Sequence, residues 1–137
     1  MDDLLRVFVY GTLKPGERYH DRYCGGRVIS AQQAMVYGHL FHLPIQRYPA
    51  LCDGNLAVYG FLLTFADPLV LNELDQLEGY SPHQLPEDNE YMRIQKETFS
   101  LNHQSLGTAW VYQMNLERAK RLGAIFLPEG LWTDRSS

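Results

Sequence analysis

The segment from Asp67 to Gly79 carries the clearest helix signals of the chain, and strand-like segments lie on both sides of it. Asp67 can accept hydrogen bonds from the free N–H groups of a first helical turn, and Pro68 has the backbone angle that the first helical position favours. Gly79 is the residue type expected just past a helix end. The sequence therefore predicts one central helix over Pro68–Glu78, set among strands.

The segments around this helix are rich in Val, Phe, Tyr and Leu, and turn-forming residues separate them. Because strands and helices do not alternate regularly, their order disfavours a doubly wound parallel sheet. We therefore predict an α+β fold, a small mixed β-barrel with short helices on its flanks. The expected strands are Leu4–Tyr10, Ala34–Leu43, Leu56–Phe65, Tyr91–Leu101 and Gly107–Met114, with a turn at Asp53–Asn55, a loop over Ser81–Asn89 and short helices over residues 17–24 and Leu116–Leu122.

Length and composition narrow the class of protein. The chain has 137 residues, 45% of them hydrophobic and 20% charged, which fits one globular domain over residues 1–137. A net charge of −4 with scattered Lys and Arg disfavours nucleic acid as a partner. No apolar run approaches the roughly 18 residues of a membrane span, and no basic N-terminal region indicates export. The sequence thus predicts a cytoplasmic protein with no membrane partner, in which Cys24 and Cys52 are free thiols.

Glu78 is an acid at the end of an apolar helix face. The helical spacing of Leu71, Leu74 and Glu78 puts all three on one side, whereas Asp75 falls toward the outside and is expected in water. A carboxyl group that points inward has its pKa raised toward neutrality, which suits it to take and return protons near pH 7. The helix pattern leaves a simpler interpretation open, in which Glu78 reaches solvent or caps a loop amide.

The turn Tyr10-Gly11-Thr12-Leu13 follows the first predicted strand. A glycine directly after a buried strand lets the backbone approach a ligand closely, and successive free N–H groups in such a turn form a concavity that binds anions. A plain strand-to-loop connection is the alternative, because a Gly-Thr pair alone is a weak signal.

The stretch Val7-Phe8-Val9-Tyr10-Gly11-Thr12-Leu13-Lys14-x-Gly16 resembles the signature of the γ-glutamylcyclotransferase-like superfamily, nearest its branch of γ-glutamylamine cyclotransferases and AIG2-like proteins. Further segments match in the same order along nearly the whole chain. These are Tyr48-Pro49-Ala50-Leu51, Val58-x-Gly60, Leu74-Asp75-x-Leu77-Glu78-Gly79-Tyr80, Tyr91-x-Arg93, Ala109-x-x-Tyr112 and Gly130-Leu131-Trp132. One departure is Phe61, where many members carry an acidic residue.

The resemblance implies an enzyme that cyclises a γ-glutamyl group to 5-oxoproline and releases an amine or amino acid. It also implies a cavity at one end of the fold, with Glu78 as acid/base and Tyr10, Gly11, Thr12 and Leu13 as substrate-binding residues. The partner would be a small γ-glutamyl molecule. This reaction needs no cofactor, and the five His residues lack the spacing of a metal site.

For several other residues, and for the function itself, more than one interpretation stays open. Tyr91 and Tyr112 are candidates for lining the cavity, although core packing is the simpler interpretation for aromatic residues on strands. Arg93 is a candidate contact for a substrate carboxylate or else an exterior strand residue, and Trp132 is predicted to pack. The rival function is a non-catalytic module on the same fold that binds a small amino-acid-like molecule. An inward Glu78 opposite an anion-binding turn disfavours that rival, while the leaving amine and the oligomeric state stay open.

Overall fold

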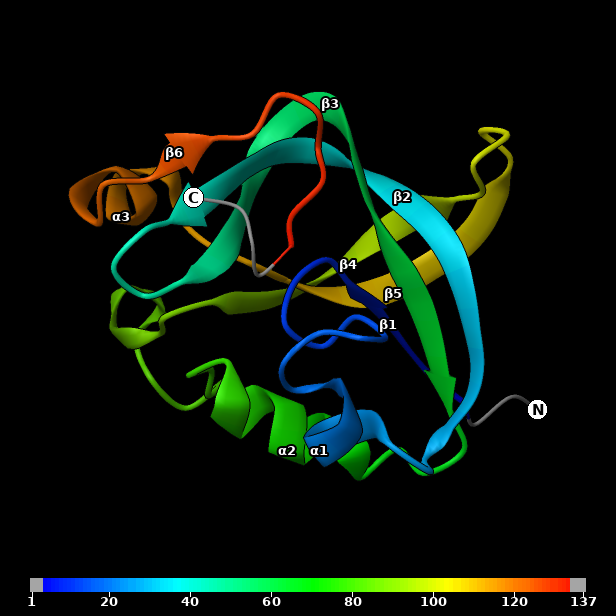
Figure 1. Ribbon diagram of the computed structural model, residues 1–137. Coiled ribbons are helices and arrows are strands. Elements are labelled where there is room, and N and C mark those ends of the chain that lie inside the picture. The colour runs from blue at the N-terminus through cyan, green and yellow to red at the C-terminus, as the bar shows by residue number, and fades with distance from the viewer. Residues whose placement is uncertain (1–3, 134–137) are drawn as a thin grey trace.

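The computed structural model describes residues 4–133, which form a curled sheet with short helices packed outside it (Figure 1). None of the helices in this range is long and apolar enough to cross a membrane. The first, fourth and fifth predicted strands are confirmed within a few residues. The second and third are also confirmed but begin earlier than predicted. The strands are β1 (Leu5–Val9), β2 (Val28–Leu43), β3 (Tyr48–Phe65), β4 (Met92–Phe99), β5 (Ser105–Gln113) and β6 (Ile125–Phe126), and the helices are α1 (His20–Cys24), α2 (Val70–Leu77), η1 (Pro86–Asp88) and α3 (Leu116–Arg121).

The sheet is mixed, with the order β3-β1-β5-β4-β2-β6 and an additional pairing between β2 and β3. β1 is antiparallel to β3 and parallel to β5, where Val7 lies opposite Trp110. β4 and β5 form the predicted antiparallel pair, and β2 meets β4 at the single pair Met35 and Phe99. The α+β class is therefore confirmed as a six-stranded mixed sheet in the described residues, and the barrel stays a prediction.

β2 and β3 form a long hairpin whose turn is at residues 44–47 (cyan to green in Figure 1). The predicted turn at Asp53–Asn55 is wrong, because these residues lie inside β3. The register of the β2–β3 ladder shifts between Gly38 and His39 of β2, so that the facing residues Asp53–Asn55 form an irregularity in the ladder. A Cβ on Gly54 would lie 2.3 Å from Cδ2 of His39, so glycine allows the chain to bulge without leaving the sheet.

Helix α2 is the predicted central helix, starting two residues later than expected, within the usual uncertainty of a helix end. Asp67 accepts a hydrogen bond just before the helix begins, since the N–H of Leu69 donates to Asp67 Oδ1 at 2.9 Å. Leu74 is fully buried against the core. Gly79 has a φ of +66°, which confirms the glycine stop just past the helix.

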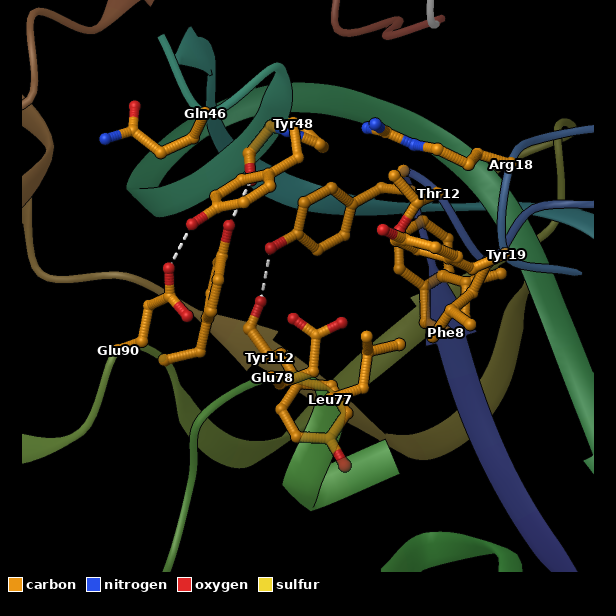
Figure 2. A pocket seen from close by; sticks show the side chains of 16 residues that line it. Phe8, Thr12, Arg18, Tyr19, Gln46, Tyr48, Leu77, Glu78, Glu90 and Tyr112 are labelled. Atoms are coloured by element: carbon orange, nitrogen blue, oxygen red, sulfur yellow. Dashed lines mark hydrogen bonds between the residues drawn. The ribbon is translucent and has the colours of Figure 1, made fainter. Parts of the chain in front are cut away.

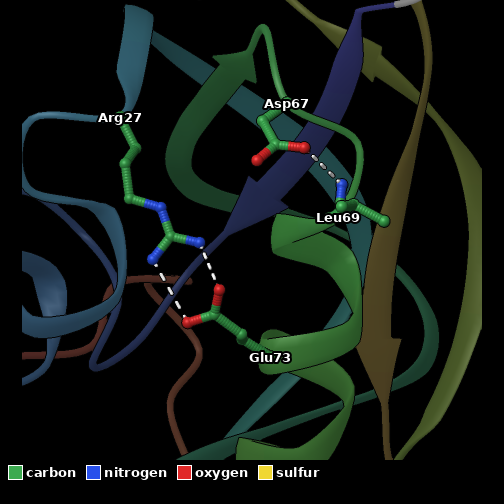
Figure 3. A network of polar contacts seen from close by, with 4 residues as sticks. All are labelled: Arg27, Asp67, Leu69 and Glu73. Carbon is green, nitrogen blue, oxygen red and sulfur yellow. Dashed lines mark hydrogen bonds and ion pairs between the residues drawn. The ribbon is translucent and has the colours of Figure 1, made fainter.

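An ion pair joins α2 to the segment after α1. Nη1 and Nη2 of Arg27 donate to Oε1 and Oε2 of Glu73 at 3.2 and 2.5 Å (Figure 3). Water reaches both side chains and screens their charges. The pair therefore orients α1 and α2 beside each other rather than holding the fold together.

The C-terminal segment is anchored inside the molecule through Trp132, whose side chain is fully buried as predicted. Its indole Nε1 donates to Nδ1 of His42 at 3.0 Å. Its carbonyl oxygen accepts a hydrogen bond from Nζ of Lys14, itself only 5% exposed. Because Lys14 directly follows the Tyr10–Leu13 turn, the turn and the C-terminal segment share one anchor.

Cys24 and Cys52 are buried free thiols, and burial raises the pKa of each to about 11. Since the thiolate is the reactive form, both should react slowly with a thiol reagent at about pH 8 in the native protein. Unfolding in denaturant without reductant should then expose two thiols, the full cysteine content. A count of zero in freshly purified, unfolded protein would contradict this expectation.

Candidate active site

A cavity of about 250 Å³ lies between the sheet and the C-terminal end of α2 (Figure 2). Its walls come from the end of β1 with the turn after it, the β2–β3 turn, the end of α2, the segment before β4 and the end of β5. Seven of the residues singled out in the sequence line it: Tyr10, Gly11, Thr12, Leu13, Glu78, Tyr91 and Tyr112. The others are Phe8, Val9, Arg18, Tyr19, Gln46, Tyr48, Pro49, Leu77 and Glu90.

Glu78 sits where α2 ends. Its N–H donates to the carbonyl of Leu74 at 2.9 Å, the last regular bond of the helix, and Gly79 then turns the chain away. Figure 2 shows the Glu78 carboxylate directed into the cavity beside Leu77. The simpler interpretation, in which Glu78 reaches bulk solvent, is therefore not what the structure shows.

The surroundings of Glu78 favour its protonated form. Burial, and secondly the negative charge of Glu90, raise the pKa of Glu78 from 4.5 to about 8. Solvent reaches Glu78 only in part, and a carboxylate with restricted hydration holds its proton more tightly. Near neutral pH this carboxyl group can therefore both donate and accept a proton.

The raised pKa of Glu78 predicts a pH-dependent stability. As pH rises from about 4.5 to about 8, the unfolded chain loses this proton before the folded chain does, so the free energy of unfolding falls in that window. Glu78→Gln should remove this slope and gain on the order of a few kcal/mol over wild type near pH 8.5. Denaturant titrations of both proteins near pH 5 and pH 8.5 measure this difference in the free energy of unfolding. Parallel pH dependence in the two proteins would contradict the raised pKa.

The turn after β1 lines the cavity with Gly11, Thr12 and Leu13. Within residues 4–133, the N–H groups of Gly11, Thr12 and Leu13 donate no hydrogen bond. The carbonyl groups fix the turn instead: that of Gly11 accepts from the N–H of Lys14 at 3.0 Å, and that of Thr12 from the N–H of Tyr19 at 2.8 Å. The turn therefore holds a row of donors in place for an anion or a polarised carbonyl.

Pro49 and three tyrosines form the wall behind the turn. A Cβ on Gly11 would lie 2.5 Å from Cγ of Pro49, so only glycine fits there. The Tyr91 hydroxyl donates to the Pro49 carbonyl at 2.5 Å, and that of Tyr10 donates to the Tyr112 carbonyl. Burial is the main reason that the pKa of Tyr10 and that of Tyr91 lie well above 10, which keeps both hydroxyls protonated as donors.

The family of the chain follows from residues 7–134, which match the family described as "Gamma-glutamyl cyclotransferase, AIG2-like". The chain belongs to this family. A relative from Vibrio cholerae serotype O1, named "Putative gamma-glutamylcyclotransferase", is 32% identical over 106 residues, which cover 77% of this chain and 78% of the relative. The resemblance seen in the motifs is thereby confirmed.

Solved structures share the fold of this AIG2-like family member. YkqA from Bacillus subtilis superposes with a TM-score of 0.63 at 23% identity over 96% of this chain, which spans 40% of the length of YkqA. An AIG2-like protein from Mus musculus gives a TM-score of 0.61 at 21% identity, covering 82% of this chain and 78% of the mouse protein. At these identities the two structures support the fold alone.

Asp75 and Arg93 lie elsewhere than the sequence indicated. Asp75 was expected in water, but its side chain is only 13% exposed, because Nε of Arg93 lies 3.0 Å from Oδ1 and the Tyr112 hydroxyl donates to Oδ1 at 2.6 Å. The Arg93 guanidinium stacks on Trp110, 4.3 Å from the ring centroid, and also faces Tyr80. Arg93 is not among the residues lining the cavity, so its pairing with Asp75 replaces the suggested contact with a substrate carboxylate.

Several polar residues of the cavity, among them Tyr48, Glu90 and Arg18, were not found by sequence reasoning. The Tyr48 hydroxyl donates to Oε2 of Glu90, and Arg18 lies across the cavity from this pair (Figure 2). Tyr48 belongs to one of the matched segments, whereas Glu90 sits at the end of a polar loop where an acid carries no signal. No three His, Cys, Asp or Glu side chains in the described part of the chain gather as a metal site would require.

Proposed function

We propose that this protein converts a γ-glutamyl group into 5-oxoproline and releases the attached amine or amino acid. One observation carries the proposal: Glu78 lines the same cavity as Gly11, Thr12 and Leu13, whose N–H groups donate no hydrogen bond within residues 4–133. Membership in the AIG2-like family and the name of the Vibrio cholerae relative support the same reaction class.

The reaction is an intramolecular aminolysis. The α-nitrogen attacks the γ-carbonyl carbon, a new C–N bond closes the five-membered ring, and the C–N bond to the leaving amine breaks. An α-ammonium group has no free electron pair, so a base must first take one of its protons. In our proposal Glu78 takes that proton and passes it to the departing nitrogen as the C–N bond breaks. The ring nitrogen loses a second proton as the ring closes, and the released amine takes up that proton to become an ammonium ion, so that protons and charge balance over the cycle.

The pKa of Glu78 suits this proton transfer. An ordinary carboxylate near 4.5 would take a proton from an ammonium group only at a large free-energy cost, because an amine holds its proton several pH units more tightly. With its own pKa raised to about 8, Glu78 can accept and return the proton at a much smaller cost.

The turn and the cavity supply binding and orientation. The N–H groups of Gly11, Thr12 and Leu13 are suited to hold either the α-carboxylate of the substrate or the oxyanion that develops on the γ-carbonyl. Since nucleophile and electrophile belong to one molecule, the remaining task is to keep the substrate folded on itself. A cavity lined by Tyr10, Tyr91 and Tyr112 serves that end.

A panel of γ-glutamyl amino acids, γ-glutamylamines and glutathione tests the proposal, with release of 5-oxoproline as the measurement. We expect release from at least one class. Binding of panel members without any release would instead favour a non-catalytic binding module.

A further inference from the structure

Asp75 and Arg93 form an ion pair just outside the cavity. Asp75 lies on α2, one turn before Glu78, and Arg93 lies on β4. Their side chains are only 13% and 15% exposed, and neither residue lines the cavity. Withdrawing two charges from water is costly, and replacing such a pair with apolar residues often leaves a fold just as stable. The pair is thus better explained by what it holds in place than by the stability of the fold.

On the sheet side, Asp75 contacts two neighbouring strands. Arg93 of β4 and Tyr112 of β5 lie directly opposite each other in the antiparallel ladder, so their side chains share one face of the sheet. Oδ1 of Asp75 lies 3.0 Å from Nε of Arg93 and accepts from the Tyr112 hydroxyl at 2.6 Å. The Arg93 guanidinium is itself stacked on Trp110 of β5, 4.3 Å from the ring centroid. One carboxylate therefore fastens α2 to both strands.

On the helix side, Asp75 closes the chain around Glu78. Its carbonyl accepts from the N–H of Tyr80 at 2.9 Å, so that Glu78 and Gly79 lie within a single hydrogen-bonded turn. The Tyr80 ring faces the Arg93 guanidinium, whose central carbon lies 5.3 Å from the ring centroid. Arg93 therefore contacts both ends of the turn that carries Glu78.

Tyr112 connects this arrangement to the cavity. Tyr112 lines the cavity, whereas Asp75, which accepts from its hydroxyl, does not. Figure 2 shows the Tyr112 ring below the Glu78 carboxylate, with its hydroxyl directed away from the cavity. Burial, the hydrogen bond to Asp75, the charge of Asp75 and then the charge of Glu78 raise the pKa of Tyr112. Asp75 thus reaches Glu78 from two directions, through the helix end and through Tyr112.

We propose that Asp75 is a positioning residue for the reaction: it fixes the end of α2 on β4 and β5 and so holds the Glu78 carboxyl group where it exchanges a proton with the substrate. This inference rests on the proposed function. Proton transfer depends steeply on geometry, and a displacement of about 1 Å can cost about 10²-fold in rate. Loss of Asp75 should therefore act on turnover more than on binding, because the N–H groups of the Tyr10–Leu13 turn are not attached to it.

Asp75→Ala removes both contacts of the carboxylate. With an active γ-glutamyl substrate we expect kcat to fall about 10–100-fold while KM stays within about threefold of wild type. Asp75→Asn keeps an acceptor for the Tyr112 hydroxyl without the charge, and its kcat should lie within about tenfold of wild type. Kinetics are measured where circular dichroism shows each variant fully folded. Unchanged kcat in Asp75→Ala, or a rise in KM alone, would overturn the role of Asp75.

Glu73→Ala is the matched control, because it breaks the other ion pair of α2, with Arg27, at a surface position outside the cavity. Its kcat should stay within about twofold of wild type. If Asp75→Ala does not fold, Tyr112→Phe takes its place, since it removes only the hydroxyl that donates to Asp75. Its kcat should fall about tenfold, and an unchanged kcat would then overturn the proposal.

A titration of the Glu78 carboxyl carbon by NMR separates this inference from the proposed function. The ionisable groups around Glu78 are those of Tyr10, Tyr48, Glu90, Tyr91 and Tyr112. Tyr112→Phe changes no charge among them near neutral pH, so a fall in the pKa of Glu78 reports water that reaches a loosened helix end.

In Tyr112→Phe we expect the pKa of Glu78 to fall from about 8 toward 4.5 by at least about one unit, and in Glu73→Ala to stay unchanged. If wild type cyclises no γ-glutamyl substrate, the proposed function fails, yet this fall would still show that Asp75 holds Glu78 through Tyr112. An unchanged pKa in Tyr112→Phe, or an equal fall in Glu73→Ala, would overturn the positioning role.

Discussion

Replacing Glu78 with Gln is expected to lower turnover of an active γ-glutamyl substrate by about 10²–10⁴-fold, the usual cost of losing a general acid/base. Gln keeps the volume and a hydrogen-bonding end but cannot carry a proton from one amine to the other. Substrate binding should remain, because the donors of the turn at Gly11, Thr12 and Leu13 are untouched. Steady-state kinetics and calorimetric binding of the same substrate measure both effects.

The control for this variant is Glu73→Gln, an identical change on the same helix. Glu73 is exposed on the outer side of α2, where it pairs with Arg27 and does not line the cavity. It should leave turnover within about twofold of wild type, as surface changes away from a site usually do. Near-normal turnover in Glu78→Gln would remove Glu78 from the mechanism.

Trp132→Ala is expected to destabilise the protein by about 3–5 kcal/mol, the range for truncating a buried large aromatic side chain. The change leaves Nδ1 of His42 without the indole donor and empties a fully buried site. It also loosens the carbonyl that accepts from Lys14, so the turn that follows β1 should lose order. Denaturant unfolding measures the loss of stability.

Leu131→Ala provides a neighbouring control, because Leu131 is 54% exposed. Its cost should stay near 0.5 kcal/mol or below, as for most surface substitutions. If the two variants lowered the free energy of unfolding by the same amount, the C-terminal segment would not be anchored through Trp132. Hydrogen exchange at the N–H groups of Lys14 and Tyr19, which donate to the carbonyls of Gly11 and Thr12, would show whether the turn loosens with it.

The parts of the fold that follow local rules could be predicted from the sequence. The strands rich in Val, Phe, Tyr and Leu, the stop at Gly79 and the inward direction of Glu78 depend on residues that are close together in the sequence. The resemblance to the family, rather than the glycine after the first strand alone, indicated that Tyr10–Leu13 line a cavity. Their role in binding substrate remains a proposal.

The parts that depend on distant partners could not be predicted in this way. Asp75 was placed in water because its helix position is outward, yet Arg93 from β4 and Tyr112 from β5 enclose it. The Asp53–Asn55 segment has the composition of a turn, and only the continuing ladder with β2 makes it an irregularity within a strand. Glu90 reaches the cavity because Gly79 and Tyr48 hold it there.

The pairing of β1 also bears on how the molecule is made. β1 lies between β3 and β5, and the parallel partner of Val7 is Trp110, near the other end of the chain. During synthesis, the first strand must therefore wait until most of the protein has left the ribosome before its second edge is covered. Contacts so distant in sequence are formed slowly. The turn that β1 carries thus acquires its full surroundings only late, and a nascent chain halted before β5 would have no working pocket.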